Sequence, residues 1–187
     1  GSIPEFYERH LVPLIFEPYA RDLARRLAAH PVRRVLEVAA GTGVATREMA
    51  RTLPPHAEII ATDLNPAMLE HAARIGTPRP VRWQPADVMD LPLDDGAVDA
   101  VVCQFGAMFF PDKPAAYAEM RRVLRPGGVL LFNVWDRIET NEFADVVTEA
   151  LAGLFPDDPP RFLARTPHGH GDPRAIARDL AAAGFEQ

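Results

Sequence analysis

The sequence predicts an α/β fold in which helices cover both faces of a parallel β-sheet. Strand-like apolar runs alternate with helical patterns, a glycine turn follows the first run, and acidic residues close successive runs. Alternating strands and helices favour right-handed crossovers, and therefore parallel strands. A chain of 187 residues is long enough for one domain with a substantial core.

The first strand-like run, Arg34–Val38, leads through Ala39-Ala40-Gly41-Thr42-Gly43 into a helical pattern, Val44–Leu53. Glycine has no Cβ, so a ligand can lie against the backbone of such a turn. The N-terminus of the following helix attracts anionic groups. Strand, glycine turn and helix together are typical of sites for nucleotide-like ligands.

Acidic residues occur in or directly after three successive strand-like runs. Glu37 lies in the first run, Asp63 closes Glu58–Thr62, and Asp87 follows Val81–Gln84. Asp63 stands about 20 residues beyond the glycines, where nucleotide-binding units place a carboxylate for ribose hydroxyls. A loop cap would explain one acid. Three acids favour a ligand site, because ligands of open α/β sheets bind outside the strand ends.

The remaining pattern extends the alternation and adds outer helical segments. Further strands are expected at Ala97–Cys103 and Val129–Val134, and further helices at Pro66–Arg74, Pro114–Leu124 and Glu139–Phe155. Asn65 is the expected cap of the helix that begins at Pro66. We divide the chain into an N-terminal helical arm or lid (1–30), a central ligand-binding core (31–136) and a helical cover (137–187). Both outer segments are expected either to cover the sheet or to lie over the strand ends as lids.

Composition excludes several classes of protein. A net charge of −6 and a pI of about 5.5 disfavour nucleic-acid binding, which depends on phosphate neutralisation. No apolar run approaches the roughly 18 residues of a membrane span. The single cysteine, Cys103, excludes an intrachain disulfide and is expected to be a buried thiol rather than a nucleophile. We therefore expect a cytoplasmic protein.

Four motifs together resemble the class I S-adenosylmethionine-dependent methyltransferases, in particular small-molecule methyltransferase domains of the kind that act in quinone and sterol biosynthesis. They are Glu37–Gly43, Asp63–Leu69, Asp87–Leu93 and Leu124–Gly128, within a resemblance that covers roughly residues 32–136. The resemblance implies a Rossmann-like, doubly wound, three-layer α/β/α sheet. It also implies S-adenosylmethionine as cofactor.

The resemblance assigns a role to each residue of the expected cofactor site. Asp63 would accept from both ribose hydroxyls, and Asp87 from the adenine amino group. The glycine turn would approach the methionine part, and Glu37 would support its cationic end through that turn. Leu64 and the Val88 N–H would contact adenine, and a carbonyl near Gln104 or Phe105 would face the ammonium group. The full expected set is Glu37, Ala39, Gly41, Gly43, Asp63, Leu64, Asp87, Val88, Gln104 and Phe105.

Two departures from the family pattern have consequences. Ala39 stands where family members often have glycine. We expect its methyl group to reduce slightly the space between the turn and the ligand. Family members close the sheet with two more strands after a phrase like Ala183-Gly184-Phe185, whereas this chain ends at Gln187. The sheet is therefore expected to lack the final two strands. Val129–Val134 would then be an open apolar edge that can pair with a second chain.

Methyl transfer to a small-molecule acceptor is the expected function, by O- or C-methylation of a quinone-like, sterol-like or other natural product. Alignment and water exclusion are its main requirements. His168 and His170 are candidate general bases for a hydroxyl acceptor, with exposed loop histidines as the plainer interpretation. A metal site of these histidines with Asp172 is disfavoured, and we expect no metal. Met108, Phe109 and Phe110 are expected to line an acceptor pocket or to pack in the core.

Two other functions stay open at this point. A nicotinamide-dependent oxidoreductase would share the strand, turn and acid. It would also need a third small residue near Arg47, and the chain has none there. A non-catalytic fragment that binds the cofactor is the second alternative. Binding of S-adenosylhomocysteine rather than NAD would favour a methyltransferase over an oxidoreductase. Tight cofactor binding without turnover on any acceptor would favour the non-catalytic fragment.

Overall fold

The computed structural model describes residues 3–186; Gly1, Ser2 and Gln187, which belong to the two outer segments, lie outside them. A five-stranded, entirely parallel sheet forms the centre, in the order β3-β2-β1-β4-β5. The predicted parallel α/β sheet is therefore confirmed. The strands are β1 (Arg34–Glu37), β2 (Glu58–Asp63), β3 (Arg82–Pro85), β4 (Val98–Gln104) and β5 (Leu124–Asn133).

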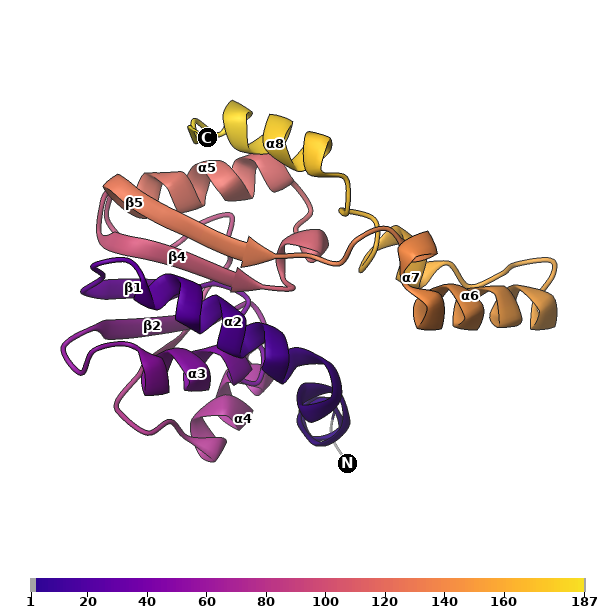
Figure 1. The fold of residues 1–187 in the computed structure, drawn as a ribbon, viewed down its shortest axis with the longest axis horizontal. Coiled ribbons are helices and arrows are strands. Elements are labelled where there is room, and N and C mark those ends of the chain that lie inside the picture. Colours follow the sequence, from indigo (N-terminus) through magenta and orange to yellow (C-terminus); the bar gives the residue numbers. More distant parts are fainter. Residues whose placement is uncertain (1–2, 187) are drawn as a thin grey trace.

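Helices lie on both sides of the sheet (Figure 1). The cores on its two faces contain α2 and α3 on one side and α5 on the other. Asn65 accepts from the Ala67 N–H at the start of α4, which confirms the predicted cap. The helices are α1 (Ile3–Phe6), η1 (Tyr7–Phe16), α2 (Glu17–Ala28), α3 (Val44–Thr52), α4 (Pro66–Ile75), η2 (Ala107–Phe109), α5 (Lys113–Val123), η3 (Ile138–Thr140), α6 (Glu142–Leu154), α7 (Phe162–Arg165) and α8 (Pro173–Ala182).

Side chains of each strand alternate between the two cores, as the period of two requires. On β1, Val35 packs in the core that contains Leu27 of α2, while Leu36 packs in the core that contains Tyr117 of α5. Cys103 of β4 is fully buried, as expected, and burial raises the pKa of its thiol to about 12. The thiol is therefore protonated at neutral pH and is no nucleophile.

Part of the segment after β5, residues 137–187, does not cover the sheet. α6 and α7 extend away from the sheet, beyond the carboxyl ends of the strands (Figure 1). Ala144 is the one residue of α6 that is buried, and Phe143 is 78% exposed. The apolar stripe that predicted this helix is thus not covered by the sheet. α8 does act as cover, since it packs against α5.

The outer edge of β5 has no strand beside it among residues 3–186. A groove of about 500 Å³ lies between the end of β5 and α8, and Phe132, Val134, Ile176 and Leu180 are among its walls. Val129–Val134 carries no charge, and such an edge presents unpaired N–H and C=O groups to another chain.

We predict concentration-dependent association through this edge. A light-scattering series should show a rising mean mass, and Leu131→Lys, which places a charge on the strand, should reduce it. A monomer of constant mass at high concentration would show that the edge is protected.

Candidate functional site

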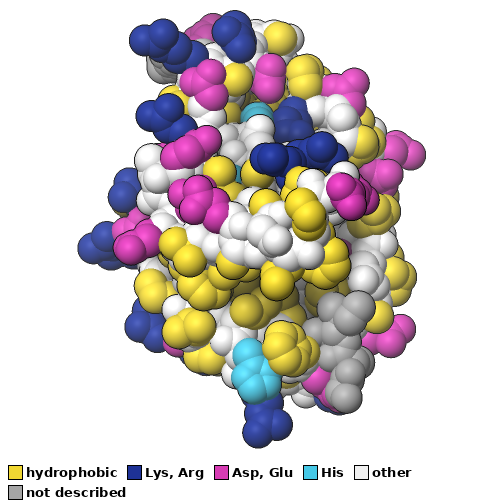
Figure 2. Space-filling view, turned by 90° about the vertical axis from the view of Figure 1, so that its right-hand side faces the viewer, with side chains coloured by type: hydrophobic (Ala, Val, Ile, Leu, Met, Phe, Trp, Pro, Cys, Tyr) yellow, Lys and Arg dark blue, Asp and Glu magenta, His cyan; other side chains and the backbone are white. Residues whose placement is uncertain are grey.

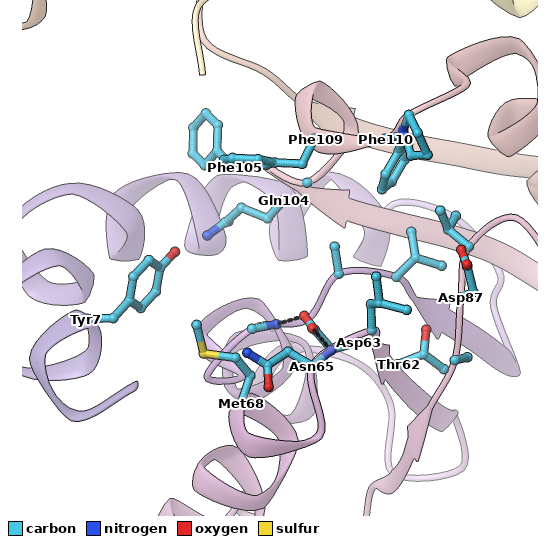
Figure 3. Close-up of a pocket in the computed structure, with 18 residues that line it drawn as sticks. Tyr7, Thr62, Asp63, Asn65, Met68, Asp87, Gln104, Phe105, Phe109 and Phe110 are labelled. Atoms are coloured by element: carbon cyan, nitrogen blue, oxygen red, sulfur yellow. Dashed lines mark hydrogen bonds between the residues drawn. The ribbon is translucent and has the colours of Figure 1, made fainter. Parts of the chain in front are cut away.

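A cavity of about 380 Å³ lies at the carboxyl ends of the strands, between the glycine turn, β2 and the end of β4 (Figure 3). Seen from this end of the molecule, hydrophobic side chains gather across the middle of the surface (Figure 2). Eight of the ten residues expected at a cofactor line the cavity: Ala39, Gly41, Asp63, Leu64, Asp87, Val88, Gln104 and Phe105.

Asp63 is the organising carboxylate of the cavity. Its Oδ2 accepts from the Gly41 N–H at 2.8 Å, and its Oδ1 accepts from the Asn65 N–H at 2.8 Å (Figure 3). The side chain therefore fixes both the glycine turn and the entry to α4. Each carboxylate oxygen can accept a further hydrogen bond, so Asp63 keeps acceptor capacity for a ligand.

Glu37, one of the two expected residues outside the lining, is buried behind the turn. The Thr46 hydroxyl donates to its Oε2 at 2.5 Å. Burial raises the pKa of Glu37 to about 8, and the negative charge of Asp63 acts in the same direction, while the bond from Thr46 and the charge of Arg47 oppose it. At neutral pH this carboxyl group is therefore mostly neutral and holds α3 against β1.

Gly43, the other residue outside the lining, is the N-cap residue before α3 and has a φ of +80°. A Cβ at this position would lie 2.8 Å from Cη2 of Trp83 and 3.1 Å from Cβ of Ala72. The glycine is thus required by the positive φ and by the close packing of the turn against β3 and α4.

Backbone strain is concentrated at the cavity. Ala39 and Phe105 have φ values of +52° and +51°, and they are the residues other than glycine with positive φ in the described chain. Each such residue costs on the order of 1 kcal/mol. For Ala39 we expected only a slight loss of space beside the ligand. The structure shows that its positive φ adds a conformational cost. Gly106 touches the same turn, since a Cβ there would lie 2.5 Å from the Ala39 Cβ.

The N-terminal arm contributes a residue that no sequence motif indicated. Tyr7 lines the cavity, and its phenol points towards the cavity from the side opposite β2 (Figure 3). Burial raises the pKa of Tyr7, and the charges of Glu8 and Asp63 raise it further. The phenol is therefore a hydrogen-bond donor throughout the physiological pH range. Gln104 lies nearby, and its buried Oε1 has no hydrogen-bond partner within the described chain.

The expected aromatic acceptor wall is divided between cavity and core. Phe109 and Phe110 line the cavity, whereas Met108 is buried outside its lining and packs with Phe16 and Phe105. The Phe105 ring stacks on Trp135, with centroids 4.1 Å apart. The stack therefore lies directly after the end of β4, at a residue with positive φ.

Both candidate histidines lie outside the cavity lining. His168 and His170 are buried, so the interpretation as exposed loop histidines is wrong. Nε2 of His170 lies 2.9 Å from the Tyr117 hydroxyl, and Nδ1 of His168 lies 2.6 Å from the Asp136 carbonyl oxygen. Burial lowers the pKa of His170, and the positive charge of Lys113 adds to the effect.

These contacts fasten the C-terminal segment to the core and place neither ring at the cavity. Residues 3–186 contain no cluster of three or more side chains arranged to hold a metal ion. Within the same range, no helix has the length and apolar character needed to cross a membrane.

Comparisons with known proteins agree with this geometry. The methyltransferase domain family matches residues 36–132. The demethylmenaquinone methyltransferase of Thermus thermophilus is 35% identical over 177 residues, which are 89% of this chain and 79% of the relative. The ubiquinone/menaquinone biosynthesis C-methyltransferase UbiE of Stutzerimonas stutzeri is 31% identical over 82% of this chain. The chain spans 65% of the length of that relative.

A solved structure shows the same fold. The S-adenosylmethionine-dependent methyltransferase of Thermotoga maritima aligns with a TM-score of 0.70 and 20% identity, over 98% of this chain and 77% of that one. The family match covers more than half of the chain, including the glycine turn, Asp63 and Asp87. The chain belongs to the S-adenosylmethionine-dependent methyltransferase family.

Proposed function

We propose that this protein transfers the methyl group of S-adenosylmethionine to a small, quinone-like acceptor. One observation carries the proposal: two carboxylates, a glycine turn and an aromatic wall meet in a single cavity at the carboxyl ends of the strands. Open α/β sheets bind their ligands at this edge. A cytoplasmic location and the absence of nucleic-acid partners stay predictions.

The residues of the cavity fit the cofactor by the chemistry of their donors and acceptors. Asp63 has acceptor capacity left for ribose hydroxyls, and Asp87 contributes a second carboxylate beside Val88. Oε1 of Gln104, which has no hydrogen-bond partner among residues 3–186, is an acceptor for an ammonium group. Leu64 and Val88 supply apolar contacts for adenine. The cofactor supplies an already activated methyl group, so the protein has to align the acceptor and exclude water.

The acceptor side is apolar and aromatic. Phe109 and Phe110 form this part of the cavity lining, and Tyr7 adds a phenol that can donate to a carbonyl or hydroxyl oxygen of the acceptor. A planar, oxygenated ring matches this combination of apolar walls and one donor. The names of the relatives, which act in menaquinone and ubiquinone synthesis, point in the same direction.

Replacing Asp63 by alanine is expected to weaken binding of S-adenosylhomocysteine by roughly 1.5–3 kcal/mol, the range for hydrogen bonds to charged groups. Calorimetry measures the dissociation constant. Asp145→Ala, which removes a carboxylate on α6 outside the cavity lining, is the control. Because Asp63 also holds Gly41, thermal unfolding of the free variant must be recorded beside it. An unchanged dissociation constant would contradict the assignment.

Two further measurements test the function itself. NAD titrated into the same protein should give no heat, and heat of binding would favour the oxidoreductase alternative. Turnover is followed as S-adenosylhomocysteine released in the presence of phenolic and quinol acceptors. Tight cofactor binding with no release on any acceptor would favour a non-catalytic role.

A further inference from the structure

Residues 3–16, the outer part of the N-terminal arm and called the arm below, are joined to α3 beside the cavity by an ion pair. Glu8, next to Tyr7, accepts from the Arg47 guanidinium of α3 at 2.5 Å. The two side chains are 22% and 11% exposed, so the pair is largely shielded from water. Breaking a shielded pair from one side leaves an uncompensated charge, which is more costly than losing a surface pair.

The same guanidinium also holds the glycine turn. Nη1 of Arg47 donates to the Thr42 carbonyl oxygen at 2.7 Å, while Nη2 donates to Glu8. Thr42 lies between Gly41 and Gly43, so Arg47 bridges the turn expected to hold the cofactor and the arm that carries Tyr7. Arginine suits this role because its planar fork directs two donors at fixed angles.

The backbone of the arm explains why it depends on such a contact. Pro13 lies inside η1 and has no N–H to donate, and the Glu17 N–H donates to the Val12 carbonyl oxygen five residues back. Wide helical turns of this kind are weaker than regular α-helix. Apolar packing of Val12 and Phe16 against Phe105 and Val44 also holds the arm, and Nε2 of Gln104 donates to the Phe16 carbonyl oxygen at 3.4 Å.

We propose that Arg47 is a positioning residue that couples the glycine turn to the N-terminal arm, so that cofactor binding at the turn and seating of Tyr7 stabilise each other. The proposal rests on the proposed function, because the ligand of the turn is the cofactor named there. Coupling of this kind is reciprocal: the ligand protects the arm, and the seated arm tightens the ligand.

Hydrogen exchange and calorimetry on the full chain test the coupling. In the free protein, Arg47→Gln should speed amide exchange in residues 5–16. The same variant should weaken S-adenosylhomocysteine binding roughly tenfold, the size of one charge-assisted hydrogen bond. Glu8→Gln removes the same ion pair but keeps the Thr42 contact, so it should speed exchange in the arm to a similar degree. The double variant should be no worse than Arg47→Gln alone, because that substitution already removes the ion pair.

Two further variants separate coupling from plain stability. Arg51→Gln removes the Glu48 ion pair one turn further along α3 and should leave exchange in the arm and ligand affinity unchanged. Arg47→Lys keeps the charge but has no fork, so it should pair with Glu8 and lose the Thr42 contact. We expect it to preserve the arm in the free protein and to lose the added protection on ligand binding.

The outcomes are distinct. Unchanged exchange in residues 5–16 in both Arg47→Gln and Glu8→Gln would overturn the proposal, as would additive effects of the two. If the unaltered protein fails to bind S-adenosylhomocysteine, the proposed function fails. In that case, faster amide exchange of residues 5–16 in Glu8→Gln would still show that the ion pair between Glu8 and Arg47 holds the arm. The coupling to this ligand would nevertheless be refuted.

Discussion

Replacing Gly106 by alanine is expected to lower the free energy of unfolding by about 1–3 kcal/mol, the cost of forcing an atom into a close-packed site. The new Cβ would lie 2.5 Å from the Ala39 Cβ and 2.8 Å from Sγ of Cys103. The Ala39 Cβ is bonded directly to the turn backbone and cannot rotate away, and the Cys103 thiol is fully buried, so it has little room to turn. Because Ala39 and Gly106 both line the cavity, ligand affinity should fall together with stability.

A second substitution tests whether the Ala39 Cβ is the cause of this loss. Ala39→Gly deletes the atom at 2.5 Å and also relieves the positive φ of Ala39. Combined with Gly106→Ala, it should restore most of the lost stability and leave the contact with Cys103 as the residual cost. Urea unfolding of the four proteins gives the coupling energy. If the changes in unfolding free energy of the two substitutions were additive, Ala39 and Gly106 would not be in contact.

Replacing Glu37 by glutamine is expected to stabilise the protein increasingly as pH rises from about 5 to 8. The folded-state pKa of about 8 lies above the ordinary value of 4.5, since burial disfavours the charge. The stability that the neutral carboxyl group contributes is therefore complete below pH 4.5 and is lost as pH rises through 8. The slope approaches roughly 1.4 kcal/mol per pH unit at its limit. Glutamine has no such dependence and can still bond to Thr46.

Urea unfolding at pH 5, 7 and 9 measures this difference between the two proteins. Glu48→Gln, which replaces a second acid of this region that pairs with Arg51 on α3, is the control for the loss of one acid. Subtracting the profiles removes the titration of all shared groups. Parallel profiles for Glu37→Gln and the unaltered protein would show that Glu37 is charged in the folded state.

Local patterns were sufficient for the sheet and for most of the cavity. The order of strands and helices follows from apolar periodicity, which short windows of sequence display. Asp63, Asp87 and the glycine turn lie at strand ends, and parallel strands bring these ends to one edge of the sheet. The cap at Asn65 depends on neighbouring residues alone.

Contacts between distant segments decided the rest. The apolar stripe of α6 predicts a helix, but which surface covers that stripe depends on the path of the chain after β5, and Phe143 stays exposed. His168 and His170 are buried because Asp136 and Tyr117 happen to lie beside them in space. No spacing rule connects these residues.

The sequence by itself determined the parallel sheet, the glycine turn and the positions of the carboxylates, because each depends on local periodicity or on a strand end. Tertiary structure alone decided that Tyr7 reaches the cavity, that Arg47 joins the arm to the turn, and that burial raises the pKa of Glu37. The physical reason is the same in all three. A hydrogen bond or a pKa depends on the atoms that surround a group, and these surroundings form when segments remote in the chain pack together.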